Sequence, residues 1–328
     1  MSETKANTPA AEAQAAASCP HARAAAAPTL AKLPEDAFES AAAVSKGGGG
    51  TTGILLVNHG SRATMWRRML LDVHAQIADE LLGITGVAQV RTAYMEYTEP
   101  SIASQLRAFD EEGITDVLVV PLLLTVSDHS FDDIPAICGQ PATAELLAAL
   151  AAENIEVYQP QARIEFAPLL DFSGLVRTNL ARRVRTVLGR GAGDGTRKSL
   201  VLVGYGSAEF DDEWHDFFNQ TRRHAEEDLD IAASTHAWCG HLVEYSRQPT
   251  IDAINRMLEV TDKVIVVPLL VSYDPMFQER IIGRAAKQSA DPSRVLYSAD
   301  AILPEPAVGD WIVRISQQLL SGACAKSA

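Results

Sequence analysis

Two histidines and one glutamate stand at the ends of predicted strands in the first half of the chain, at His59, Glu96 and His129. The carboxyl ends of parallel strands meet at one edge of a sheet, so we expect these three side chains to lie near one another. Imidazole nitrogens and a carboxylate together favour a divalent transition metal such as cobalt, nickel, iron or zinc. The same groups can serve as general bases near neutral pH. The simpler alternatives are a strand-end histidine that hydrogen-bonds a neighbouring carbonyl group and a solvated Glu96.

The second half of the chain repeats the first without these histidines. Three pairs of similar segments begin at residues 53 and 199, 96 and 244, and 119 and 266, so the spacing stays between 146 and 148 residues. A repeat of this length is a duplicated domain, because solenoid units have periods of roughly 20–50 residues. Tyr205 stands where the first half has His59, and no histidine of the second half matches His129. We therefore expect two similar lobes, with the chemistry in the N-terminal one.

In both halves, apolar runs typical of buried strands alternate with segments of helical periodicity. The predicted strands of the first half are Ile54–Asn58, Val87–Met95, Val117–Pro121 and Ile155–Gln159, and its helices are 64–82, 102–112, 143–152 and 169–188. The second half has predicted strands at 200–203, 232–243, 263–268 and 295–298, and helices at 213–229, 250–260, 277–289 and 308–320. This order predicts an α/β fold of two tandem, similar lobes, each an open parallel sheet with helices on both faces, and an active cleft between them.

Changes in composition along the chain suggest the domain boundaries. Residues 1–50 are rich in alanine and proline and end in a glycine run, which predicts a disordered tail. The N-terminal lobe is expected at 51–188, a glycine-rich linker at 189–197, the C-terminal lobe at 198–322 and a short tail at 323–328.

The composition also limits the partners and the location. A net charge of −14 argues against nucleic acid, because phosphate contacts need a concentrated basic surface. The four cysteines form no zinc or disulfide pattern, so a reducing cytoplasm is expected. Apolar runs of about ten residues are too short to cross a membrane, and the start lacks the features of a signal peptide. A monomer would suffice, since the duplication already supplies two lobes.

Three ordered motifs carry a family resemblance, at Val57–Arg62, Met95–Ile102 and Val120–Pro135. Together they resemble the CbiX-type sirohydrochlorin chelatases, which are class II tetrapyrrole chelatases, and the resemblance covers roughly residues 53–320 in the long, two-lobed form. It implies a lyase that inserts a divalent metal into sirohydrochlorin without ATP, for cobalamin or siroheme biosynthesis. No organic cofactor is implied. The metal is the substrate, with Co²⁺ favoured, Fe²⁺ next and Ni²⁺ also in range.

The resemblance also assigns roles to the three residues at the strand ends. His59 and His129 match the two metal-binding histidines, and Glu96 matches an acid that is a third ligand or a proton acceptor. The segment before His129 departs from the family, because Thr125–Asp128 stands where many relatives have a glycine. The second lobe, with Tyr205 in place of His59, is expected to shape the macrocycle pocket without binding metal.

Sirohydrochlorin carries many carboxylates, so a cationic rim is expected, and arginine suits carboxylates better than lysine does. Arg62, Arg67 and Arg68 follow the His59 loop and are candidates, with a solvated helix face as the alternative. Tyrosines near the strand ends, Tyr94 among them, are candidates for stacking on a flat ligand, although core packing is the alternative. The predicted substrate-binding residues are Gly60, Ser61, Arg62, Tyr94, Tyr205 and Ser207.

Several alternatives stay open. His236, His241 and Glu244 lie near the end of a second-lobe strand, where alternation places His241 and Glu244 on opposite faces, so a compact metal site there is not expected. A non-catalytic metal or tetrapyrrole carrier would use the same histidines. A histidine phosphatase is disfavoured, because Asn58 stands where those enzymes have a phosphate-binding arginine. The physiological metal and the pathway are not encoded in any of these features.

Overall fold

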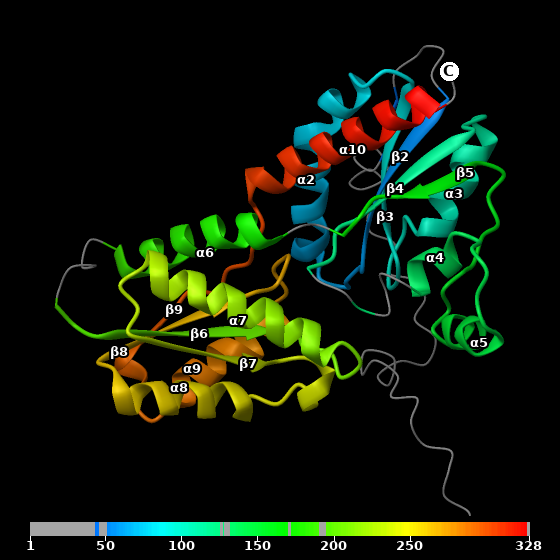
Figure 1. Cartoon of the computed structure of the whole chain (residues 1–328). Helices are drawn as coiled ribbons and strands as arrows, with labels where there is room; N and C mark the ends of the chain where they lie inside the picture. Colours follow the sequence, from blue (N-terminus) through cyan, green and yellow to red (C-terminus); the bar gives the residue numbers. More distant parts are fainter. Residues whose placement is uncertain are drawn as a thin grey trace, which may run out of the picture.

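The computed structural model describes residues 43–45, 51–124, 127, 132–169, 172–189 and 195–326. His129 lies outside these ranges. The chain forms two sheets that lie in separate lobes (Figure 1), as the repeat predicts. Within the described residues, no helix is both long and apolar enough to cross a membrane.

The first sheet has the strand order β1-β3-β2-β4-β5. Its strands are β1 (Ala43–Ser45), β2 (Thr52–Asn58), β3 (Val87–Tyr94), β4 (Asp116–Pro121) and β5 (Arg163–Phe166), and helices α2 (Thr64–Leu82), α3 (Ile102–Glu111), α4 (Ile134–Ile137) and α5 (Ala144–Ala152) accompany them. The strands β2 to β5 pair in parallel, whereas β1 pairs antiparallel with β3 and comes from the segment expected to be a tail. Almost every residue of β2 is buried, because helices cover both faces of the sheet.

The strand expected at 155–159 is wrong, since β5 begins at Arg163. Ile155 is buried and Val157 is exposed, and the backbone of this segment bonds to the ends of two helices instead of joining the sheet. Ile155 donates its backbone N–H to the Leu150 carbonyl at the end of α5, and Tyr158 donates to the Ile137 carbonyl at the end of α4. The hydrogen bonds that a strand would need are therefore already made.

The second sheet is parallel throughout, with the order β7-β6-β8-β9. Its elements are β6 (Lys198–Gly204), α7 (Asp211–Asp228), β7 (Ala233–Trp238), the 3₁₀ turn η4 (His241–Val243), α8 (Gln248–Val260), β8 (Lys263–Pro268), the π-helix η5 (Met276–Gly283), α9 (Arg284–Gln288), the 3₁₀ turn η6 (Pro292–Arg294) and β9 (Val295–Tyr297). The strand expected to reach residue 243 ends at Trp238, because the chain turns into η4 and then takes positive φ at Glu244 and Tyr245. The helix expected at 277–289 is π-helical in its first part.

The last helix of each half packs on the other lobe (Figure 1). Helix α6 (Phe172–Leu188) contacts α7 and β8 of the second lobe, and α10 (Pro306–Lys326) contacts α2 of the first. On α6, Arg183 donates to the Pro268 carbonyl at the end of β8 (2.8 Å). On α10, Gly309 lies so close to α2 that a Cβ atom there would be 2.8 Å from Ile77. The exchange joins the two lobes through both helices.

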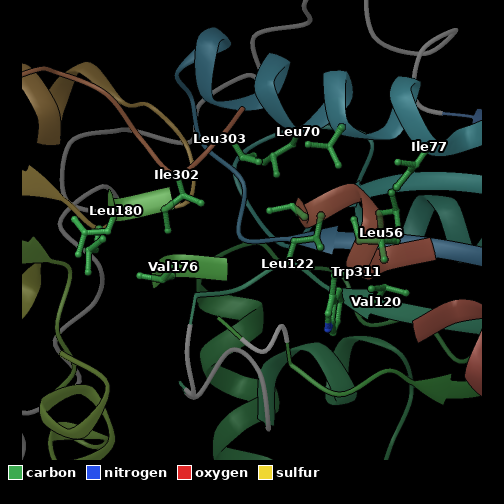
Figure 2. Packing of buried hydrophobic residues seen from close by; sticks show 14 of the residues in the cluster. Leu56, Leu70, Ile77, Val120, Leu122, Val176, Leu180, Ile302, Leu303 and Trp311 are labelled. Atoms are coloured by element: carbon green, nitrogen blue, oxygen red, sulfur yellow. The ribbon is translucent and has the colours of Figure 1, made fainter. Parts of the chain in front are cut away.

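One buried cluster follows from this exchange and extends through both lobes. Figure 2 shows part of it, where Leu70 and Ile77 of α2, Val176 and Leu180 of α6 and Trp311 of α10 belong to the same packed group. Because the core is continuous, it fixes the position of one sheet relative to the other.

Candidate active site

A cavity of about 500 Å³ lies between the lobes, at the carboxyl ends of the strands of both sheets. This volume is within the range of roughly 300–1,000 Å³ usual for ligand pockets. The first lobe contributes His59, Gly60, Ser61, Arg62, Trp66 and Tyr97, and the second contributes Tyr205, Ser207, His241, Asp274, Phe277 and Arg280, among others. Five of the six predicted substrate-binding residues line the cavity; Tyr94 does not.

His59, on the first-lobe wall of the cavity, forms a close pair with the buried Glu96 behind it. Nε2 of His59 lies 2.9 Å from Oε1 of Glu96, and Nδ1 lies 3.1 Å from the Gly60 carbonyl oxygen. The backbone holds the pair, because the Glu96 N–H donates to the His59 carbonyl directly beyond the paired ends of β2 and β3 (3.0 Å). Gly60 is required here, since its φ is +97° and a Cβ atom would be 2.1 Å from the Glu96 carbonyl oxygen.

The neighbours of His59 favour its charged form. Burial alone lowers the pKa of His59, but the hydrogen bond and negative charge of Glu96 raise it, and the Gly60 carbonyl adds to the increase. The pKa of His59 therefore lies above its ordinary value. Without a bound metal, Glu96 therefore stabilises the protonated imidazolium form of His59.

The spacing of the pair also suits two ligands of one metal ion. Two donor atoms about 2.1 Å from an ion and at a right angle to each other are about 3 Å apart. The 2.9 Å between Nε2 and Oε1 matches that separation. Among the described residues, no group of three or more histidine, cysteine or acidic side chains forms a metal cluster, and the predicted third ligand, His129, lies outside them.

In the second lobe, the counterpart of the His59–Glu96 pair is Tyr205 and Gly240. The Gly240 N–H donates to the Tyr205 carbonyl (3.0 Å), as Glu96 does to His59. The sequence comparison instead paired Glu96 with Glu244, which is wrong in three dimensions. A Cβ atom on Gly240 would lie 2.7 Å from Cδ1 of the Tyr205 ring, so the larger ring leaves no room for a side chain opposite it.

Four extra residues follow this point in the second half. Tyr94 and Trp238 are equivalent strand ends, because each pairs with the last residue of the first strand of its lobe, and they are 144 residues apart. The next equivalent tyrosines, at 97 and 245, are 148 residues apart, so the second half has four more residues between these points. The extra residues form the turn η4 and bring His241 to the cavity. The alternation argument for His241 was therefore wrong, because the strand has already ended.

The cationic rim contains fewer of the predicted arginines than expected. Arg62 lines the cavity, with its guanidinium carbon 5.2 Å from the centre of the Tyr97 ring. Arg67 is buried and donates to the Thr98 hydroxyl (2.6 Å), and Arg68 is exposed but does not line the cavity. Arg280 of the second lobe, which sequence reasoning missed, does line it.

Tyr94 is a core residue and not a cavity residue, which corrects its predicted role. It is fully buried, and its hydroxyl donates to the Arg67 carbonyl (3.4 Å). Burial also raises the pKa of Tyr94. Its alternation on β3 turns the ring into the sheet-helix interface, and Tyr97, three residues later, reaches the cavity instead.

Loops of the two lobes interlock beside the cavity. The Ser61 hydroxyl donates to Oδ2 of Asp274 (2.9 Å), and the Ser272 hydroxyl donates to the Trp66 carbonyl (3.0 Å). Ser207, the counterpart of Ser61, accepts from the Phe210 N–H within its own lobe (3.2 Å). Sequence reasoning missed Asp274, which lies as far beyond its strand as Ser127 does in the first half.

His236 does not line the cavity. Its ring packs against Trp238 and Phe218, with centroid distances of 4.9 and 5.5 Å. Burial, with the charge of Arg222 adding to it, lowers the pKa of His236 to about 4. Its role is structural, and among the second-lobe candidates it is His241 that reaches the cavity.

Known proteins resemble this chain in sequence and in structure. The CbiX family model matches residues 53–187. A sirohydrochlorin cobaltochelatase from Methanococcoides burtonii is 32% identical over 85 residues, which are 26% of this chain and 62% of that protein. The chloroplastic sirohydrochlorin ferrochelatase of Arabidopsis thaliana is 33% identical over 104 residues, which are 32% of this chain and 44% of that protein. The chain thus spans less than two thirds of the length of these curated relatives.

Solved structures extend the likeness to both lobes. The sirohydrochlorin chelatase SirB from Bacillus subtilis subspecies spizizenii, in complex with cobalt, superposes with a TM-score of 0.56 at 19% identity, covering 83% of this chain and 97% of that one. CbiX, described as the terminal enzyme of siroheme biosynthesis in denitrifying bacteria, gives 0.52 at 15% identity, covering 80% and 97%. At these identities the likeness establishes the two-lobed fold. Over residues 53–187, which form most of the first lobe, this chain is similar to the CbiX family.

Proposed function

We propose that this protein inserts a divalent metal ion into sirohydrochlorin without ATP, as a lyase that forms metal–nitrogen bonds. The observation that carries the proposal is the His59–Glu96 pair, at ligand spacing, whose histidine lines a mostly apolar cavity between two lobes. Relatives named sirohydrochlorin cobaltochelatase and ferrochelatase support the choice of tetrapyrrole. Co²⁺ is the favoured metal, Fe²⁺ is next and Ni²⁺ is third, for cobalamin or siroheme biosynthesis.

The chemistry requires a site that holds a metal ion and then releases it. Insertion replaces two pyrrole N–H protons of the macrocycle by one divalent ion. In the proposed site His59, Glu96 and His129 hold the ion. A neutral imidazole binds it without cancelling its charge, whereas a carboxylate strengthens the hold. The metal is a substrate, and no organic cofactor takes part in the proposed reaction.

The cavity offers groups for the macrocycle and its carboxylates. Arg62 is a candidate partner for a carboxylate, because its guanidinium group presents paired donors. Gly60 and Ser61 lie at the start of the same loop, and Tyr205 and Ser207 supply the facing wall. Because the duplication supplies both walls, the proposed enzyme is complete as a monomer, and the cysteine pattern favours the cytoplasm.

An anaerobic absorbance assay tests the proposal. Wild-type protein with sirohydrochlorin and Co²⁺, Fe²⁺ or Ni²⁺ in turn should give multiple turnovers. The variants His59→Ala and His129→Ala should lose them, and His224→Ala, a histidine of α7 that does not line the cavity, should keep them. Binding of sirohydrochlorin without turnover would contradict the chelatase proposal and favour a tetrapyrrole carrier. Full activity in His59→Ala would contradict the proposed metal site.

A further inference from the structure

The second lobe presents an imidazole of its own to the cavity. His241 lies in the turn η4, within the four residues that the first half lacks. Its ring stands 5.4 Å from the Tyr205 ring at an angle of 57°. Tyr205 is the residue that occupies the backbone position of His59, and its hydroxyl lies 3.0 Å from the Tyr245 hydroxyl. The second lobe therefore has a tyrosine at the strand end where the first lobe has a histidine, and it has a histidine at another point of its own side of the cavity.

Metal insertion needs a base that is not a metal ligand. While Nε2 of His59 and Oε1 of Glu96 hold the ion, the lone pairs of those two atoms are occupied. They cannot accept the pyrrole protons until the ion has left. An acceptor other than these two atoms is therefore needed when the first metal–nitrogen bond forms, and Glu96, whose second oxygen could serve, does not line the cavity.

The cavity-lining side chains that the structure describes offer few other acceptors. Besides His59, the titratable ones are Arg62, Tyr97, Tyr205, His241, Asp274 and Arg280. Guanidinium and phenol groups carry their protons at neutral pH and act as donors. Asp274 already accepts a hydrogen bond at each oxygen, at Oδ2 from Ser61 and at Oδ1 from the Met276 N–H, and the bond from Ser61 joins the two lobes. The imidazole of His241 is the candidate base, because it lines the cavity and is exposed.

We infer that His241 accepts the pyrrole protons during metal insertion. The inference rests on the proposed function. In each transfer a pyrrole N–H bond breaks, its electron pair stays on the pyrrole nitrogen and forms a bond to the metal, and the proton forms a new bond to the His241 imidazole. His241 is exposed, so the imidazolium passes this proton to water before the second transfer. The metal leaves His59 and Glu96 as its four bonds to the macrocycle form.

The test separates proton transfer from metal binding. His241→Ala should lower the turnover of Co²⁺ insertion into sirohydrochlorin by about 10²-fold, the typical contribution of general base catalysis. The affinity for Co²⁺ measured without tetrapyrrole should stay within twofold of wild type. Added 2-methylimidazole, a base whose methyl group hinders metal binding, should restore part of the turnover. A structural role for His241 would not respond to an added base.

The matched control is His224→Ala, which removes a histidine of the same lobe from outside the cavity and should change neither quantity. If the wild type is active and His241→Ala inserts Co²⁺ equally fast, only the inference about His241 is overturned. A slowed His241→Ala that no added base rescues, or one with weakened Co²⁺ binding, would also overturn it. An inactive wild type that binds both substrates would overturn the proposed function, and the role of His241 with it.

Discussion

The Nε2 atom of His59 has two competing partners, a proton and a metal ion, and Glu96 favours both. Because Glu96 raises the pKa of His59, the proton competes with the metal at a higher pH than it would for an isolated histidine. Below that pKa, the apparent affinity for a metal should fall with each further pH unit. The pair thus links metal loading to pH.

Glu96→Gln should weaken Co²⁺ binding by about 100-fold or more, since the loss of a ligand costs at least as much as the 10–100-fold usual for a residue that only supports one. It should also move the pH midpoint of binding downward, because the charge of Glu96 that raises the pKa of His59 is removed. Calorimetric titration with Co²⁺ between pH 6 and 8 measures both effects. An unchanged midpoint would show that Glu96 does not control His59.

His74 predicts a separate dependence of folding stability on pH. It is fully buried in α2, with Nδ1 2.7 Å from the Thr92 hydroxyl, and burial lowers its pKa to about 4. The unfolded chain therefore takes up the proton first, so the stabilisation is present above about pH 6.5 and is lost as the pH falls toward 4. His74→Asn should reduce the loss in unfolding free energy between pH 8 and 5 by about 2 kcal/mol. Urea denaturation at both pH values checks this, and His224→Asn, on the partly exposed part of α7, should leave the loss unchanged.

At the scale of elements, the turn after β2 determines the position of the proposed metal pair. Gly60 and its counterpart Gly206 both have positive φ, at +97° and +83°, so the turn is kept in both lobes although the residues before it differ. The first turn also needs open space at the α-carbon, because the Glu96 carbonyl lies against it.

Gly60→Ala should therefore abolish high-affinity Co²⁺ binding and lower the melting temperature. Gly113→Ala is the matched control, since Gly113 also has positive φ (+75°) but no atom lies within 4 Å of an added Cβ. The control should lose only the roughly 1 kcal/mol expected for backbone strain. Equal effects of the two substitutions on Co²⁺ binding would argue against the close contact with Glu96.

At the scale of the whole molecule, the exchanged helices make each lobe depend on the other half of the chain. Helix α10 covers α2, and α6 covers α7, so the buried cluster continues from one lobe into the other. We propose that the segment between residues 188 and 198 separates the two copies of the repeat. The two copies nevertheless fold and unfold together as one cooperative unit.

Trp311→Ala on α10 should lower the free energy of unfolding by about 3–5 kcal/mol, because it leaves a cavity in the shared core. Both lobes should still unfold in one transition when followed by fluorescence and by circular dichroism in urea. Gln317→Ala, at an exposed position of the same helix, should cost under about 0.5 kcal/mol. Two separate transitions in the wild type would contradict a shared core.

The amino-acid sequence by itself determined the alternation of strands and helices, the duplication and the approach of His59 to Glu96. Each depends on local patterns, since a buried apolar run defines a strand and the carboxyl ends of parallel strands share one edge. Only the tertiary structure decided the exchange of α6 and α10, the contact of Ser61 with Asp274, the burial of Tyr94 and the presence of His241 in the cavity. These depend on how side chains from different elements fit together, or on a four-residue insertion whose conformation no periodic pattern describes.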